Sequence, residues 1–214
     1  MEVESYEPYH IGNKLNPATN FDSLKTKLKE KLKTTGYSVT EKMLSGQQII
    51  LGLSIETLGT KNDVRVELNH IAHALNVIGT KPESVTEIFT EITSILPDIG
   101  YELDKISLLY EIIASIIIKS DGKPIDILNK SVNLDLTSLS MDELNMNIIG
   151  MRIGGENTEK GKSFALAIEP NVTSPSSRFL VKAKYWSKET VDIELFYKDL
   201  DTKIINLISQ MEKA

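Results

Sequence analysis

Apolar and polar residues alternate in two stretches of the chain, and each stretch follows a loop that contains glycine. In the first stretch the apolar residues alternate with charged ones and are Val64, Val66 and Leu68. In the second they alternate with alanines and are Phe164, Leu166 and Ile168. Because a period of two places successive side chains on opposite faces of a strand, such alternation beside a glycine-bearing loop is typical of a β-hairpin. We therefore predict an antiparallel hairpin in each region.

The same short pattern precedes both hairpins. Residues 50–55 (ILGLSI) and 148–153 (IIGMRI) both read isoleucine, aliphatic, glycine, leucine or methionine, polar, isoleucine. The glycine-bearing loops that follow are LGTKND and GGENTEKGK, and each hairpin is followed by a third alternating segment, at 74–78 and at 179–186. Features that recur in one order predict a tandem duplication. The first α+β repeat would cover residues 21–97, and the second would cover 98–214 with an insertion near 106–144.

Apolar residues at spacings of three and four predict three amphipathic helices. They cover about 21–33, 83–96 and 191–212. Pro82 suits the first turn of the middle helix, and Pro97 suits its end. The predicted class is α+β, with a curved antiparallel sheet, helices on one of its faces, and a saddle-like or helix-grip-like shape. Residues 1–20 are predicted to be an irregular N-terminal segment of one structural unit.

Residues 101–119 fit two interpretations. Several apolar residues have helical spacing, namely Leu103, Ile106, Tyr110, Ile113 and Ile117. The isoleucine-rich, β-branched run and the match between the two repeats favour a buried strand instead. An apolar strand at the edge of a sheet would invite pairing with another chain, so the run 106–118 is an argument for self-association.

Composition limits the classes of function. The net charge is −6, which gives no general support for binding to nucleic acids or membranes. The chain has no cysteine, so disulfides and cysteine-bound metals are excluded. The longest apolar run, 106–118, is shorter than the roughly 20 residues that span a bilayer, and the first residues, MEVESYEPYH, are acidic and polar. We expect a cytoplasmic protein that does not bind membranes.

The stretch GGENTEKGKS, residues 154–163, differs from a phosphate-binding loop by one extra residue. A working loop of that kind opens a helix, because its phosphate lies on the N–H groups of the helix N-terminus. Here the alternating residues that follow predict a strand. We therefore interpret the stretch as a polar hairpin tip.

Histidines and carboxylates give no recognisable catalytic or metal-binding pattern. His70 and His73 could share a helical face, as in some metal sites, but they lie in a predicted connection and lack a third ligand with suitable spacing. His10 has no evident partner within the N-terminal segment. We predict no catalytic residue, no cofactor and no metal.

Two groups of residues are candidates for binding a partner. Lysines surround the apolar stripe of the helix at 24–33, and Lys25, Lys29 and Lys33 could contact phosphates, RNA or an acidic protein. They could equally be solvent-facing residues of a helix that packs on the sheet. Tyr185 and Trp186 form the second group, because tyrosine and tryptophan are enriched at binding hot spots. Trp186 lies on the polar side of its strand, where it could anchor a partner or be covered by the neighbouring repeat.

These observations favour a non-enzymatic interaction or adaptor protein that binds a macromolecular partner or self-associates through sheet surfaces. One alternative is a small-ligand-binding protein, or an enzyme without a recognisable motif, with a pocket between sheet and helices. Another is an RNA- or ribosome-associated factor that uses the lysine-rich helix.

Overall fold

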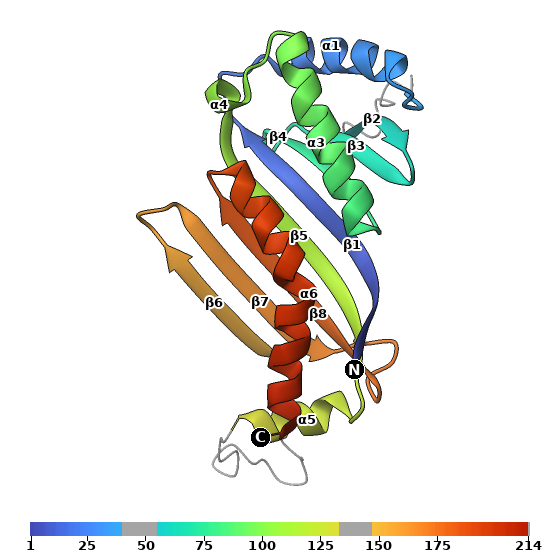
Figure 1. Cartoon of the computed structure of the whole chain (residues 1–214), viewed down its shortest axis with the longest axis vertical. Coiled ribbons are helices and arrows are strands. Elements are labelled where there is room, and N and C mark those ends of the chain that lie inside the picture. Colours follow the sequence, from blue (N-terminus) through green and yellow to red (C-terminus); the bar gives the residue numbers. More distant parts are fainter. Residues whose placement is uncertain (40–54, 133–146, 214) are drawn as a thin grey trace.

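The computed structural model describes residues 1–39, 55–132 and 147–213. Eight strands form one antiparallel sheet in the order β2-β3-β4-β1-β5-β8-β7-β6 (Figure 1). Together with five helices in the described residues, this sheet confirms the predicted α+β class. The strands are β1 (Glu2–Leu15), β2 (Ile55–Lys61), β3 (Val64–Asn69), β4 (Ala74–Gly79), β5 (Ser107–Lys119), β6 (Met151–Asn157), β7 (Lys162–Pro170) and β8 (Arg178–Ser187).

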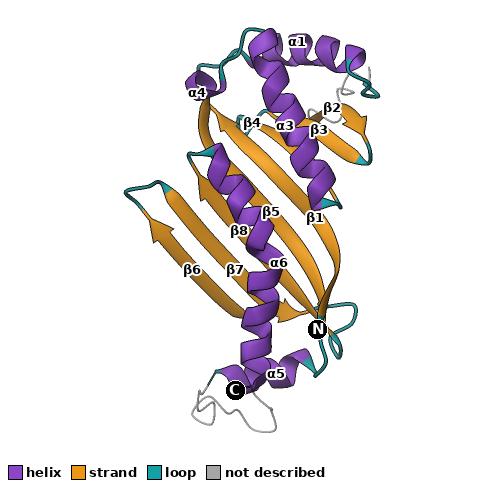
Figure 2. Ribbon diagram, viewed as in Figure 1, coloured by secondary structure: helices purple, strands orange, loops and turns teal. Residues whose placement is uncertain are grey.

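The two longest helices lie on one face of the sheet and form a second layer there (Figure 2). α3 (Pro82–Asp98) packs on β1 and β4, and α6 (Thr190–Lys213) packs on β8 and β5. α1 (Phe21–Thr34) contacts β2, and α5 (Pro124–Ser131) contacts α6. The short α4 (Leu103–Ile106) leads directly into β5. The three helices predicted at 21–33, 83–96 and 191–212 are confirmed as α1, α3 and α6.

The same order of elements occurs twice along the described chain. Residues 2–98 run strand, helix, three strands, helix, and residues 107–213 run through the same order again. The first strand of each half lies at the centre of the sheet, where β1 and β5 pair antiparallel with Ile11 opposite Ile112. The two half-sheets therefore meet along a single seam between β1 and β5 (Figure 1).

The core lies between the sheet and the helices. Alternate residues of the central strands point to this side and are fully buried, such as Tyr9 and Ile11 in β1 and Ile116 in β5. The helices supply their apolar stripes, including Ile88 and Ile92 of α3. The side of the sheet away from α3 and α6 has no helix over it in the described part of the chain, and we call it the open face (Figure 2).

Two predictions about strands are wrong, and both concern the centre of the sheet. Residues 2–15 form β1 instead of an irregular segment, because their main chain pairs with β4 on one side and β5 on the other. The run 106–118 is a strand from Ser107 on, as favoured, but it is a central strand and not an edge, since β5 lies between β1 and β8. Its apolar character reflects burial and gives no support to self-association.

The loop LGTKND is also shorter than predicted. β2 continues to Lys61, and the turn is made by Asn62 and Asp63, whose φ angles are 51° and 61°. Apart from Ile55, the predicted strand at 50–55 lies outside the described residues.

Candidate functional site

A row of polar side chains crosses the open face at the seam between the half-sheets. The strand registers align Glu67, Asn76, Gly12, Glu111 and Trp186 in that order, on β3, β4, β1, β5 and β8. Residues on five strands that are distant in sequence therefore lie side by side. Sequence reasoning missed this row, because pairing of β1 with β4 and β5 is needed to assemble it.

Trp186 is held within this row by its own molecule. Its Nε1 donates a hydrogen bond to Glu111 Oε2 at 2.5 Å, and Lys184 Nζ lies 2.8 Å from the same oxygen. Lys184 Nζ also lies over the indole ring, 4.5 Å from its centroid. The indole N–H of Trp186, the predicted anchor for a partner, is thus already hydrogen-bonded within the molecule. Trp186 lies on the open face, as its position on the polar side of the strand predicted.

Gly12 leaves room for two neighbouring side chains. A Cβ at this position would lie 3.0 Å from both Asn76 Oδ1 and His10 Nε2. Burial lowers the pKa of His10, so its imidazole is neutral near pH 7. No group of three side chains suited to metal binding comes together within the described residues.

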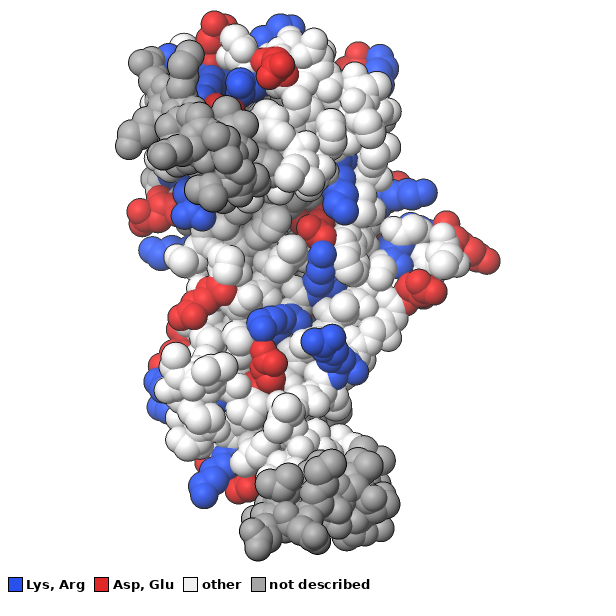
Figure 3. All heavy atoms as spheres, turned by 180° about the vertical axis from the view of Figure 1, so that it is seen from behind, with Lys and Arg blue, Asp and Glu red and all other residues white. Residues whose placement is uncertain are grey.

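Charges alternate in sign over the open face (Figure 3). Lys182 pairs with Glu169 at 2.8 Å and Arg65 pairs with Glu67 at 2.9 Å, in addition to the Lys184–Glu111 pair. A face that carries paired charges of both signs lacks the continuous positive potential that a phosphate backbone requires.

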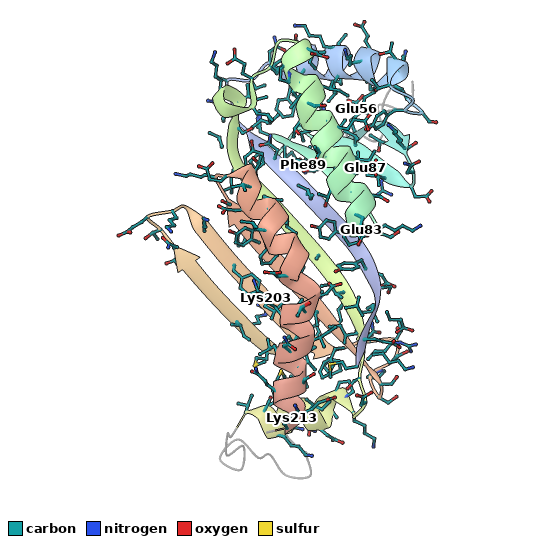
Figure 4. The ribbon with its side chains drawn as sticks, in the orientation of Figure 1. Glu56, Glu83, Glu87, Phe89, Lys203 and Lys213 are labelled. Atoms are coloured by element: carbon teal, nitrogen blue, oxygen red, sulfur yellow. The ribbon has the colours of Figure 1, made fainter. Side chains whose placement is uncertain are left out.

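Lys25 and Lys29 of α1 face a carboxylate of the sheet. Glu56 on β2 is only 12% exposed and lies under α1, where its oxygens are 2.6 Å from Lys29 Nζ and 3.5 Å from Lys25 Nζ (Figure 4). Burial alone would raise the pKa of Glu56, but the hydrogen bond and charge of Lys29, with the charge of Lys25, outweigh burial and lower it. Two of the three predicted phosphate-binding lysines are therefore ion-paired inside the molecule, while Lys33 is exposed near the end of the helix.

His70 and His73 lie in the turn between β3 and β4, which confirms that they belong to a connection between strands. His70 Nε2 is 3.6 Å from Glu56 Oε2, and both rings pack against Phe21 with centroids 5.7 and 5.0 Å away. The histidines thus help to hold the start of α1 on the sheet.

Tyr185 and Trp186 do not form a common surface. Tyr185 points to the helix side, where its ring stacks on Phe196 of α6 at 4.4 Å with an interplanar angle of 4°. Burial raises the pKa of Tyr185. Since successive residues of a strand face opposite sides, the two aromatic residues cannot contact one partner surface together.

A small groove lies between α3 and the start of α6. Its volume is about 130 Å³, and Phe89 of α3 forms part of its wall (Figure 4). Its polar lining comes mainly from threonines, and Thr86 and Thr90 donate their hydroxyl hydrogens to carbonyl groups of their own helix. Sites for small molecules usually enclose about 300–1,000 Å³ with polar groups that point inward. The groove has neither property.

The stretch GGENTEKGKS forms part of the hairpin between β6 and β7, which confirms the predicted hairpin. The turn at its tip is shorter than predicted. Both β6 glycines, Gly154 and Gly155, are paired strand residues, and the turn follows Asn157. Gly161 takes a φ of 60° in this turn, a conformation that glycine adopts without strain. Lys162, the lysine of the apparent phosphate loop, lies 2.6 Å from Asp192 of α6.

The two edges of the sheet differ. At the β2 edge, the main chain of Ser38 exchanges two 3.0 Å hydrogen bonds with Thr60, and a bulge interrupts the strand between Thr57 and Gly59. At the other edge, β6 pairs with β7 alone in the described residues, and six of its seven residues are exposed. Its sequence, MRIGGEN, contains no proline or lysine, two residues that natural edge strands use to prevent pairing.

Comparison with known proteins gives no relative. No family model, no curated protein and no solved structure matches the chain. Among the described helices, none has the length and apolar character needed to cross a membrane. Inferences about function therefore depend on the geometry of the molecule.

Proposed function

We propose that the protein is a non-enzymatic interaction module that binds a protein partner in extended conformation along β6. The observation that carries this proposal is the outer edge of β6, which pairs with no further strand in the part of the chain that the structure describes. An edge strand offers a row of main-chain N–H and C=O groups, and a partner strand that pairs with them extends the sheet. Such pairing needs neither a pocket nor a cofactor.

The side chains of β6 also favour pairing. Ile153 is 37% exposed and points to the helix side, where its neighbour on β7 is Leu166. Gly155 has no heavy atom within 4 Å of the position that a Cβ would occupy, so a partner side chain has room beside it. A partner strand would bury Ile153 and fill the space beside Gly155.

The two alternative functions have less support. The groove between α3 and α6 is smaller than a typical small-ligand site, and the larger hollows beside Asn62 (about 470 Å³) and Lys27 (about 420 Å³) are wide open to solvent. An RNA- or ribosome-associated role would need free lysines on α1, whereas Lys25 and Lys29 are paired with Glu56.

We also propose that the two halves arose by tandem duplication and that the sheet has a saddle-like shape. The repeated order of elements and the central pairing of β1 with β5 support this origin. On this view the equivalent edge strands β2 and β6 have diverged, because a second segment covers part of β2 whereas no described segment covers β6. A difference between duplicated edges is consistent with a function at one of them.

Cross-linking within cells tests the proposed function. A photoreactive amino acid would replace Ile153, and a control chain would carry it at Val172, which is apolar and 87% exposed but lies in the loop between β7 and β8. We expect a discrete adduct from position 153 and none of the same mass from position 172. The adduct should disappear in a chain that also carries Gly155→Lys, because an edge lysine opposes strand pairing. Equal adducts from both positions, or none from position 153, would contradict the proposal.

A further inference from the structure

The charges of β6 are arranged symmetrically about one residue. In Met151–Asn157, Arg152 and Glu156 lie two positions before and two positions after Gly154. When two copies of such a strand pair antiparallel around a twofold axis at Gly154, each Arg152 lies opposite Glu156 of the other copy. The strand is thus complementary in charge to itself.

We propose that the partner at β6 is a second copy of this chain, which pairs β6 with β6 antiparallel about a twofold axis at Gly154. This inference rests on the proposed function and names its partner. The two sheets become one continuous sheet, and α3 and α6 of both copies lie on the same side of it.

The charges that would pair between copies have no ion pair with any residue that the structure describes. Arg152 and Glu156 are both exposed, and neither has an ion pair within the described residues. Their β7 neighbours, Ala167 and Ser163, are small residues of the open face, so the long side chains are unobstructed there. Other charges of the open face already have partners, such as Lys182 with Glu169. Opposite charges on directly facing residues stabilise an antiparallel strand pair.

On the helix side, the two paired β6 strands are complementary to each other in shape. In the same register, Ile153 lies opposite Gly155 of the other copy, where the position of a Cβ has no atom within 4 Å. The exposed isoleucine of each copy therefore enters the open space beside the glycine of the other. This contact occurs twice, because the axis relates the two copies.

Other registers lack these matches. An axis at Ile153 places Arg152 opposite Gly154, and an axis at Gly155 places Arg152 opposite Thr158. Parallel pairing in register would align Arg152 with Arg152 and Glu156 with Glu156, which is repulsive. Only the antiparallel register about Gly154 forms two ion pairs and fills both spaces.

Exchange of the two charges tests the proposal in the full-length chain. Analytical ultracentrifugation should show a monomer–dimer equilibrium for the unmodified protein. R152E and E156R each place two like-charge pairs in the dimer, so each should weaken dimerisation at least about tenfold. An equimolar mixture of the two variants restores both ion pairs in a heterodimer, and the double variant R152E/E156R restores them in a homodimer. We expect both to recover the original affinity.

The controls separate this inference from the proposed function. Thermal unfolding of each variant at a concentration where it is monomeric should match that of the unmodified protein, because both side chains are exposed and have no ion pair among the described residues. A chain that stays monomeric at the highest concentration at which it is soluble, or charge variants that dimerise as well as the unmodified protein, would overturn self-pairing. If the cross-link from position 153 then joins the chain to a different protein, the proposed function holds and self-pairing fails. If position 153 gives no adduct, both fail.

Discussion

Replacement of Glu56 by glutamine tests whether the lysines of α1 serve the fold. Glu56 is 12% exposed and accepts a hydrogen bond of 2.6 Å from Lys29. A hydrogen bond to a charged group contributes about 1.5–3 kcal/mol, and the more distant Lys25 adds less than about 1 kcal/mol. Since glutamine can still accept a hydrogen bond, we expect the free energy of unfolding to fall by about 2 kcal/mol. In a chain of this length, that loss lowers the melting temperature by about 4–8 °C.

The effect should depend on pH in a defined direction. The pKa of Glu56 in the folded protein lies below its ordinary value of 4.5. The charged form is therefore favoured by folding, and its contribution to stability is fully present above the unfolded pKa. It is lost as the pH falls through the lower, folded pKa. The difference between the unmodified protein and Glu56→Gln should be constant near neutral pH and shrink well below 4.5.

Urea unfolding, followed by circular dichroism at neutral and acidic pH, measures both effects. Glu30→Gln is a matched control, because Glu30 lies on α1 but is exposed and has no ion pair in the described residues. We expect that control to change stability by less than about 0.5 kcal/mol. A Glu56→Gln variant as stable as the control, or a difference that persists unchanged in acid, would refute the reasoning. Stronger RNA binding by Glu56→Gln would show instead that the released lysines can bind phosphates.

Two further substitutions test the centre of the sheet. Gly12→Ala should destabilise the protein by about 1–3 kcal/mol, because the new Cβ would lie 3.0 Å from Asn76 and His10. Gly155→Ala is the control, because the space beside Gly155 is open, and thermal unfolding should show that it is tolerated. Ile116→Ala should cost about 2–5 kcal/mol, because Ile116 is completely buried in β5. Leu108→Ala, at a residue of the same strand that is 51% exposed, should cost under about 1 kcal/mol, and equal losses at both positions would contradict a central β5.

The helices could be predicted from the sequence because their apolar spacing survives in the fold. The buried residues of α3 include Val85, Ile88, Ile92 and Ile95, which repeat at the helical period. β1 could not be recognised in the same way. Register shifts between Val3 and Ser5 and between Tyr6 and Tyr9 interrupt its period of two, and the buried Asn13 puts a polar residue on its core side. Tyr9, Ile11 and Leu15 retain the spacing of two or four that could have revealed it.

The candidate site illustrates a second limit of sequence reasoning. The symmetry of Arg152 and Glu156 about Gly154 is visible in the sequence, but it has meaning only for a strand at an edge. Which strand lies at an edge depends on pairing between distant segments, here of β1 with β5. The lysines of α1 were misleading for the same reason, since Glu56 is brought beneath them by the fold.

The central position of β5 has a consequence for synthesis on the ribosome. The first half of the sheet is complete once α3 has emerged, and β5 can then pair with β1. β8, which covers the other side of β5, begins about sixty residues after β5 ends. At about 5–20 residues per second, the isoleucine-rich strand therefore has an open side for roughly 3–12 s in each round of translation. The strand that is best protected in the finished molecule is the one most exposed to aggregation while the chain is being made.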